Sequence, residues 1–189
     1  MQQRKLTLVR SSRKTLSLQI RPDGSLLVRA PLKLPEKEIL EFVREKSDWI
    51  DKHLQKVERT NRAAEEAPLS MEDIHNLAEQ ALRELPIRVR FFAEKMGVTY
   101  GRITIRNQRG RCGSCSSAGN LNFNCLLMLS PPEVRDYVIV HELAHRKQMN
   151  HSAAFWEEVE KVLPDYRQRL KWLKDQGPQL LARMTAGAE

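Results

Sequence analysis

The amino-acid sequence predicts an α+β protein, because two kinds of apolar periodicity occupy different stretches of it. Apolar and polar residues alternate near the N-terminus and again between residues 103 and 125. Along much of the remaining chain, apolar residues recur every three to four positions. The first period is typical of half-buried strands, and the second of helices that bury one face. We therefore expect a small antiparallel sheet in each alternating region, with helices between and after them.

The N-terminal region is predicted to form a strand, a β-hairpin and a long helix. The alternating segments are residues 6–8, 16–20 and 26–30. The turn residues PDGS, at positions 22–25, separate the last two segments and indicate a hairpin. A helical apolar face then extends over residues 36–58, with Lys46 as its single polar member.

The next helix is expected to begin at Ser70, a good N-cap residue, with Asp73 in the first helical turn. Pro86 should end or kink this helix, because proline lacks the N–H group that a helix interior uses. A further helical piece is expected over residues 87–96, and Gly97 predicts its end.

The second alternating region predicts two short strands, at residues 103–105 and 121–125. Residues 109–119 between them are rich in Gly and Ser and predict a loop. A helix should follow, with Ser130 as N-cap, Pro131 as its first residue and an end near Asn150. The remaining segments are helices over residues 152–162 and 164–174 and a loosely held tail over residues 178–189.

These elements suggest two folded regions joined by a connecting segment. Residues 60–68 (TNRAAEEAP) have no apolar period, which is typical of a linker. We expect an N-terminal β-hairpin plus helix region, a linker, a second and larger domain, and a C-terminal tail. Their expected boundaries are residues 1–60, 61–70, 71–176 and 177–189.

The composition indicates a soluble globular protein, since 41% of the 189 residues are apolar and 30% are charged. No segment approaches the roughly 18–20 consecutive apolar residues of a membrane helix, so no membrane association is expected. The N-terminus lacks the apolar block of a secretion signal, and the chain has only three cysteines. We therefore expect the reducing cytoplasm.

The net charge of +8 favours anionic partners such as nucleic acid, nucleotides or acidic peptides. On the predicted helices, however, many basic residues are interspersed with acidic ones, which is typical of solvated helix faces. Because no nucleic-acid-binding motif accompanies the charge, we rank nucleic acid below the other partners.

The segment HELAH at residues 141–145 is the strongest functional signal. His141 and His145 are four residues apart and share one helix face, so that their imidazoles can bind one metal ion. Glu142 points beside that face, where its carboxylate could act as general base toward a metal-activated water. The alternative is a helix with two ordinary histidines, but the apolar run at 138–140 predicts burial, and buried unpaired imidazoles are costly.

A catalytic zinc site needs a third protein ligand, and His151 is the best candidate because Asn150 can turn the chain back toward the ion. The alternatives on the following helix are Glu157, Glu158 and Glu160. His53 and His75 lie in charged helical segments and are expected at the surface.

Cys112 and Cys115 form a single CxxC spacing, with Cys125 nearby. A structural zinc site would need a fourth ligand at a suitable spacing, and a redox pair would open a helix. Neither context is present, so we expect ordinary loop and core cysteines.

Much of the chain resembles the YgjP-like metal-dependent hydrolases, a family grouped with the zincin metallopeptidases and similar in its C-terminal core to the SprT-like and WLM proteases. The matching segments are GSCSS (113–117), GNLNFN (119–124), PPE (131–133), HELAH (141–145), NHS (150–152), FW (155–156), PDY (164–166) and WL (172–173). The hairpin at 22–24 and the helix through Trp49 resemble the family's N-terminal region.

The resemblance implies a zincin-like helical metallopeptidase core over residues 71–176. It implies Zn²⁺ as the cofactor, with His141, His145 and His151 as its ligands and Glu142 as the base. The chain departs from the family at Cys112 and Cys125, where an aromatic residue is usual, and it is shorter around residues 61–70.

Three functions follow as hypotheses. The first is a zinc metallopeptidase, in which an extended peptide or protein substrate lies along the strand at 121–125. Its oxyanion would need a donor, for which Arg111, Tyr166 and Arg167 are candidates. The second is a metal-dependent nucleoside-triphosphate pyrophosphohydrolase, an activity also attached to the family name, with phosphates held by Arg106, Arg109 and Arg111. The third is a nucleic-acid-associated protease.

Overall fold

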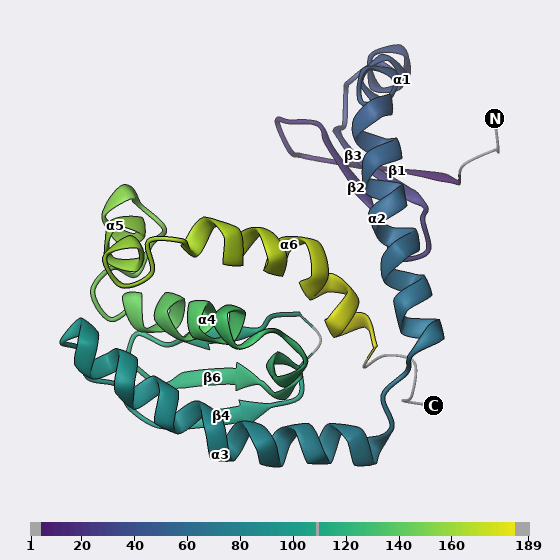
Figure 1. The fold of residues 1–189 in the computed structure, drawn as a ribbon. Helices are drawn as coiled ribbons and strands as arrows, with labels where there is room; N and C mark the ends of the chain where they lie inside the picture. Colours follow the sequence, from purple (N-terminus) through teal and green to yellow (C-terminus); the bar gives the residue numbers. More distant parts are fainter. Residues whose placement is uncertain (1–4, 109, 184–189) are drawn as a thin grey trace. The chain divides into compact units, whose positions relative to one another are not determined.

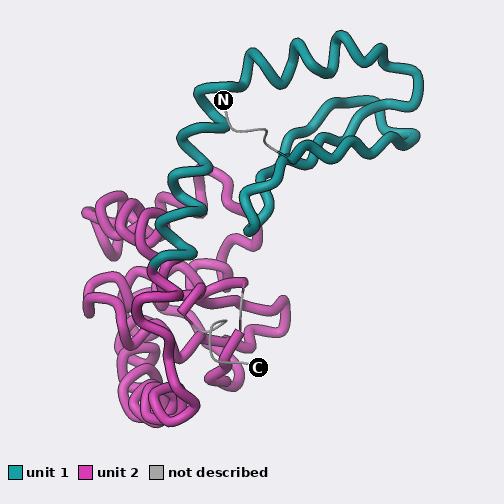
Figure 2. Tube along the Cα trace, turned by 90° about the vertical axis from the view of Figure 1, so that its right-hand side faces the viewer, with its two compact units in different colours: residues 1–62 teal, residues 63–189 magenta. Residues whose placement is uncertain are grey.

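The computed structural model describes residues 5–108 and 110–183, and the chain divides into two compact units, residues 1–62 and 63–189 (Figure 2). Six α-helices and two three-stranded sheets make up the described elements, so that the predicted α+β class is confirmed. Within the described residues, no helix is both long enough and apolar enough to cross a membrane.

The first unit begins with a three-stranded sheet. Its strands are β1 (Leu6–Ser11), β2 (Ser17–Ile20) and β3 (Leu26–Pro31), in the order β1-β3-β2. The predicted hairpin joins β2 and β3, and Gly24 in its turn has the left-handed φ of 77°. Strand β3 pairs antiparallel with β2 on one side and parallel with β1 on the other, so that the sheet is mixed rather than wholly antiparallel.

The helix predicted over residues 36–58 is two helices, α1 (Glu36–Glu45) and α2 (Ser47–Glu66). The break falls at Lys46, the polar member of the predicted face, and Ser47 and Asp48 are residues that favour a new helix start. Helix α2 also includes residues 61–66, which were predicted to be linker. No Gly or Pro interrupts this Ala- and Glu-rich segment, so that its intrinsic propensity sustains a helix without an apolar face.

The second unit begins with α3 (Met71–Met96), whose N-cap is Ser70 and whose C-cap is Gly97, as predicted. The Ser70 side chain accepts a hydrogen bond from Asp73 N, and the Asp73 side chain accepts one from Ser70 N. Pro86 was predicted to end or kink the helix, and it lies inside α3 without ending it. The carbonyl that Pro86 leaves unpaired belongs to Leu82 on the exposed side, while Leu85 and Val89 continue the buried face across the proline.

A second mixed sheet contains β4 (Ile103–Arg106), β5 (Gly113–Cys115) and β6 (Leu121–Asn124), in the order β4-β6-β5. Strand β5 lies in the segment predicted to be a loop, and its strand conformation comes from antiparallel pairing with β6. Strand β6 ends at Asn124, one residue earlier than predicted. The Asn124 side chain accepts from Leu126 N and starts the short 3-10 helix η1 (Cys125–Leu129).

Three helices complete the second unit: α4 (Pro132–Ala144), α5 (Ala153–Val162) and α6 (Tyr166–Ala182). Figure 1 shows the sheet between α3 and α4, and α6 packs against α4. The N-cap of α4 is Pro131, while the Ser130 hydroxyl donates to Leu127 O. The core beneath the helices is apolar and fully buried, including Phe123, Leu126, Ile139, Leu143 and Phe155.

Two helix ends in this unit differ from the prediction. Helix α4 stops at Ala144, six residues before Asn150, where Arg146 N and Lys147 N bond to the carbonyls three residues back, Leu143 O and Ala144 O. Helix α6 continues past Lys174 to Ala182, with Pro178 inside it. Its end is held rather than loose: Arg183 Nε donates to Ala67 O, and Leu69 N donates to Arg183 O. The last predicted tail residues, 184–189, lie outside the described part of the chain.

Candidate metal centre

The burial of the apolar residues of α4 fixes the orientation of the helix and hence the positions of the two imidazoles at its C-terminal end. Val138, Ile139 and Val140 are at most 3% exposed, so that the helix cannot rotate away from the core. His141 lies in the last turn of α4, and His145 is its C-cap residue. The chain then turns, and the Asn150 side chain accepts from Ser152 N just before α5 begins. This turn returns His151 to the two imidazoles of α4.

The three imidazoles form a group with the geometry of a metal site. Their nearest ring nitrogens all lie within 4.8 Å of one another, and His151 Nε2 is 3.0 Å from His141 Nε2. Three nitrogens about 2.0–2.1 Å from one tetrahedral Zn²⁺ would be roughly 3.3 Å apart. The residues therefore fit such an ion. Among the described residues, these three histidines are the group of His, Cys, Asp or Glu side chains whose donor atoms lie close enough together to bind one metal ion.

Contacts on the outer side of two imidazoles fix which nitrogen faces inward. His141 Nδ1 is 3.4 Å from the Tyr137 hydroxyl, and His145 Nδ1 is 3.1 Å from Gln148 O. With the Nδ1 protons donated to these oxygens, each Nε2 keeps its lone pair for a metal. Tyr137 was not predicted to take part in the site. Its position four residues before His141, on the same helix face, is the signal that would have identified it.

Aromatic rings support the imidazoles from α5. The Phe155 ring is fully buried, and its centroid lies 4.7–4.9 Å from those of all three histidines. Trp156 stacks on His151, and Tyr166 stacks in turn on Trp156. These contacts limit the rotation of the imidazoles, which keeps the nitrogen donors in place.

Burial keeps the imidazoles of α4 neutral. The pKa of His141 falls to about 3, because burial and the neighbouring His145 and His151 disfavour its charged form. Burial also lowers the pKa of His145. Neutral imidazole is the form that binds a metal, so that no proton has to be displaced from these two rings near neutral pH.

Glu142 places a buried carboxylate beside the three imidazoles. The residue is 6% exposed, and burial raises its pKa to about 7, against the opposing effect of the Arg111 guanidinium. Strand β5 can approach so closely because residue 113 is glycine. A Cβ atom at Gly113 would lie 2.7 Å from Glu142 Oε1 and 3.0 Å from Glu142 Cγ. A carboxylate with a pKa near neutrality is suited to accepting and returning a proton.

The raised pKa of Glu142 predicts a pH-dependent stability for the metal-free protein. The pKa is 4.5 for an ordinary Glu side chain and about 7 for Glu142 in the fold, so that the folded protein is favoured while Glu142 is protonated. This contribution to the free energy of unfolding is complete below pH 4.5 and is lost as the pH rises through 7. Glu142→Gln removes this loss. Its free energy of unfolding relative to wild type should therefore rise by about 2–3 kcal/mol between pH 5 and pH 8. Urea unfolding with a chelator at both pH values measures it; parallel pH profiles would contradict the burial of an ionisable Glu142.

The other candidate site residues occupy different places. Arg111 lines the same cavity as Glu142 and the three histidines, whereas Tyr166 is buried against Trp156, and Arg167 pairs with Glu160 at 3.0 Å. Glu158 pairs with Lys147 and Lys161. Neither Glu157, Glu158 nor Glu160 belongs to the three-histidine group. The two histidines expected at the surface are elsewhere: His75 pairs with Glu79, and His53 stacks on Trp49.

Cys112, Cys115 and Cys125 are free. Strand β5 keeps the backbone extended between Cys112 and Cys115, which puts their Cα atoms about 10 Å apart at roughly 3.3 Å per residue. A disulfide requires less than about 7 Å. Burial and the nearby Glu142 raise the pKa of Cys112 to about 11, so that its thiol remains protonated.

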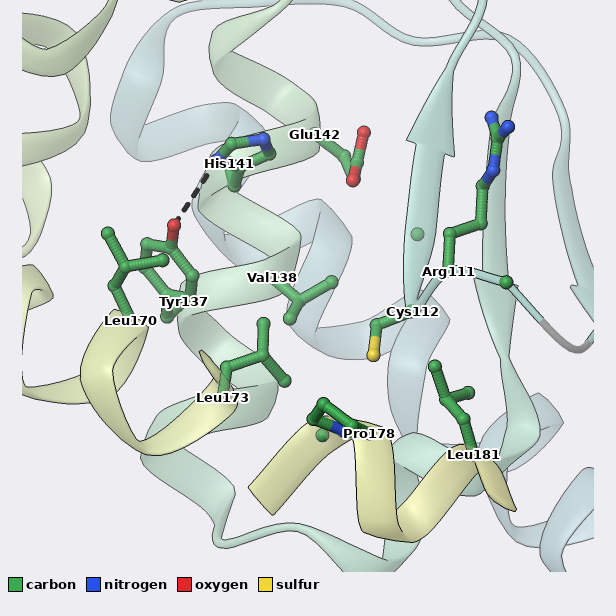
Figure 3. Close-up of a pocket in the computed structure, with 13 residues that line it drawn as sticks. Arg111, Cys112, Tyr137, Val138, His141, Glu142, Leu170, Leu173, Pro178 and Leu181 are labelled. Carbon is green, nitrogen blue, oxygen red and sulfur yellow. Dashed lines mark hydrogen bonds between the residues drawn. The ribbon is translucent and has the colours of Figure 1, made fainter. Parts of the chain in front are cut away.

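Two cavities adjoin at Glu142. The metal-side cavity, of about 380 Å³, is lined by Arg111, Gly113, Ser114, Cys115, His141, Glu142, His145, Met149 and His151. The apolar cavity, of about 310 Å³, lies between α4, α6 and the start of β5 (Figure 3). Arg111, Gly113, His141 and Glu142 line both. A ligand in the metal-side cavity therefore has the apolar cavity directly beside it.

An α+β fold that joins three imidazoles to a buried carboxylate has the arrangement of a metal-dependent hydrolase. The model of one family, described as the YgjP-like metallopeptidase domain, matches residues 14–83 and 72–176. The chain therefore belongs to the YgjP-like metallopeptidase family, as its sequence motifs predicted.

Two metallopeptidase zymogens are among the solved structures that are similar to part of the chain. The metallopeptidase zymogen abylysin of Pyrococcus abyssi is 25% identical, with a TM-score of 0.43, over 48% of this chain and 94% of abylysin. The metallopeptidase zymogen jannalysin of Methanocaldococcus jannaschii is 21% identical, with a TM-score of 0.43, over 48% of this chain and 95% of jannalysin. No curated protein sequence matches the chain.

Proposed function

We propose that the protein is a zinc-dependent metallopeptidase in which His141, His145 and His151 hold the metal and Glu142 is the general base. The observation that carries the proposal is the set of three imidazole nitrogens within 4.8 Å of one another, beside a carboxylate that is 6% exposed. When bound, Zn²⁺ would polarise the scissile carbonyl and lower the pKa of a water.

The side chains around the ion have distinct tasks in this proposal. Glu142 takes the proton of the attacking water and then gives it to the leaving amine, for which its raised pKa is suitable. Arg111, which lines both cavities, donates to the carbonyl oxygen as negative charge develops there. Tyr137 and Gln148 O orient the imidazoles of His141 and His145.

The sheet supplies an edge along which an extended peptide can lie. The sequence placed this edge at residues 121–125, but β6 is paired on both sides, with β4 and β5. The strand bordering the metal-side cavity is β5, which pairs with β6 on one side. We infer that a peptide substrate adds to β5, where its scissile bond would pass between Glu142 and the histidines.

The test compares substrate classes. Zinc-loaded protein is incubated with casein and, separately, with the nucleoside triphosphates. Peptide products support the proposal, and release of pyrophosphate without peptide products would replace it with the pyrophosphohydrolase. Of the two described arginines assigned to phosphates in that alternative, Arg106 donates to Asn122 and only Arg111 lines the metal-side cavity. Arg109 is outside the described residues.

The close approach of β5 to Glu142 gives a prediction. In Gly113→Ala, the new methyl group would displace the Glu142 carboxylate, since the present separations of 2.7 and 3.0 Å are too short for a carbon contact. We expect kcat to fall about 10-fold or more with zinc affinity unchanged, because misplacing a catalytic group is costly to the reaction and the three ligands do not move. Ser117→Ala, at an exposed position that lines neither cavity, is the control. Equal activity of Gly113→Ala and wild type would show that the carboxylate position is not critical.

One observation favours the nucleic-acid-associated protease as a second candidate function. Residues 1–35 contain eight basic and one acidic side chain, a net charge of +7, whereas residues 36–62 contain seven of each. Lys14, Arg29 and Lys33 of this sheet region are exposed. The region contains no aromatic residue, so that it would bind phosphates without stacking on bases.

For this candidate, the protein should bind duplex DNA of any sequence, with a Kd on the order of 10⁻⁴–10⁻⁶ M near physiological salt. Replacing Lys14, Arg29 and Lys33 with Ala should reduce the slope of log K against log salt by about 3, since each phosphate contact contributes about 0.9. The matched control replaces Lys52, Lys56 and Arg59 of α2, which are equally exposed but lie in the neutral segment. Equal slopes for the two triple variants would exclude the sheet as the binding surface.

A further inference from the structure

The apolar cavity is formed by one face of each of three elements. Helix α4 contributes Tyr137 and Val138, which lie one turn before His141 and Glu142. Helix α6 contributes Leu170, Leu173, Gly177 and Leu181, whose spacing of three to four residues defines a single helix face. Cys112 closes the third side, and Figure 3 shows its thiol pointing toward α6.

The chemistry of the cavity changes from its mouth to its interior. The charged and ligand side chains, Arg111, His141 and Glu142, are the ones shared with the metal-side cavity. Beyond them, the lining is aliphatic apart from Tyr137 and the protonated thiol of Cys112. An apolar group could enter without losing hydrogen bonds, whereas a charged group would lose its hydration and find no partner there.

Helix α6 leaves space for an occupant at Gly177. This glycine is buried, and a Cβ atom placed on it would meet Leu173 Cδ1 at 3.4 Å and Leu173 Cγ at 3.7 Å. Pro178 follows within the helix, and proline bends a helix because it lacks an N–H group and its ring crowds the preceding turn. The volume of about 310 Å³ is at the lower end of the range for small-molecule pockets, which suits one large side chain.

We propose that the apolar cavity is a substrate subsite that receives a large apolar side chain, of leucine or phenylalanine size, from a residue next to the scissile bond. The proposal rests on the peptidase function. The four residues shared by the two cavities place the apolar cavity beside the reacting centre, provided that a peptide bond is cleaved in the metal-side cavity. It adds a substrate preference that the metal site alone does not specify. Leu173, Gly177 and Cys112 are the residues that determine it.

The first experiment measures cleavage preference in peptides that differ at one position. Wild type should cleave bonds flanked by Leu or Phe about 10–200-fold faster, in kcat/KM, than the same bonds flanked by Gly or Asp. In Gly177→Leu, the new side chain occupies the cavity, and this ratio should fall at least 10-fold. Gln176→Leu is the matched control, since residue 176 is exposed on the same helix and is not part of the cavity lining.

A second measurement does not depend on hydrolysis. N-acetyl-leucine amide, titrated into the protein, should shift the methyl NMR signals of Leu170, Leu173 and Leu181, and N-acetyl-glycine amide should not. Gly177→Leu should abolish these shifts, and Gly177→Ala, which adds a methyl group that the structure can accommodate, should weaken them. Thermal unfolding of each variant verifies that it is folded.

The outcomes separate the two proposals. Absence of all peptide cleavage, together with leucine-amide shifts, would reject the peptidase and retain the apolar binding site. Cleavage with no preference for large apolar residues would overturn the subsite and leave the peptidase. A preference that Gly177→Leu changes no more than Gln176→Leu does would likewise overturn it.

Discussion

Replacing Glu142 with Gln is expected to lower kcat by about 10²–10⁴-fold, which is the usual contribution of a general base. The amide has nearly the same shape as the carboxylate but cannot accept the proton of the attacking water. Because Glu142 is not among the three histidines proposed to bind the metal, bound zinc should stay at one ion per chain. The measurements are kcat on a peptide substrate and metal content, made on the same preparations.

The matched control for this substitution is Glu157→Gln, on the exposed side of α5. It makes the same chemical change outside the two cavities and should leave kcat within about twofold of wild type. Full activity of Glu142→Gln would reject Glu142 as the base. Loss of zinc together with activity would instead indicate that its carboxylate takes part in metal binding.

Removing one imidazole is expected to abolish the stabilisation that zinc provides. At a free zinc concentration about 1,000-fold above its Kd, binding to the folded state alone adds about 4 kcal/mol to the free energy of unfolding. For a domain of this size, that corresponds to a rise in Tm of about 10 °C. In His141→Ala and His145→Ala, the rise should disappear, since two imidazoles bind zinc far more weakly than three.

His151→Ala is the most informative variant of this series, because His151 is exposed and lies outside α4. It should lose the zinc-dependent rise in Tm as fully as His141→Ala does. His75→Ala, an exposed histidine paired with Glu79 on α3, should keep it. If His151→Ala retained the full rise, the third ligand would have to be another side chain, and the proposed site would be incomplete.

The parts of the site that could be predicted are those that depend on short stretches of chain. His141, Glu142 and His145 occupy fixed directions on one helix, so that their spacing determines their relative positions. Only five residues separate His145 from His151, and a single turn determines whether they meet. The same spacing rule could have identified Tyr137, which lies four residues before His141. Its role in orienting His141, however, requires the Tyr137 hydroxyl to face the Nδ1 atom of His141, and only the structure shows this.

The parts that could not be predicted depend on pairing between distant segments. Gly113 and Glu142 are 29 positions apart, and nothing local in the Gly- and Ser-rich segment indicates a strand. Its conformation comes from the β6 partner. The apolar cavity likewise needs α6 to pack on α4, which involves a helix that continues through Pro178 beyond its predicted end.

The sequence by itself determined the α+β class through its periodicity, the family through its motifs, and the relative positions of His141, Glu142 and His145 through their spacing. Each of these signals acts over a short stretch of chain. Tertiary structure alone decided that β5 lies against the carboxylate, that burial moves its pKa toward neutrality, and that an apolar cavity opens beside it. These properties arise from close packing and exclusion of water, and both depend on which remote segments meet.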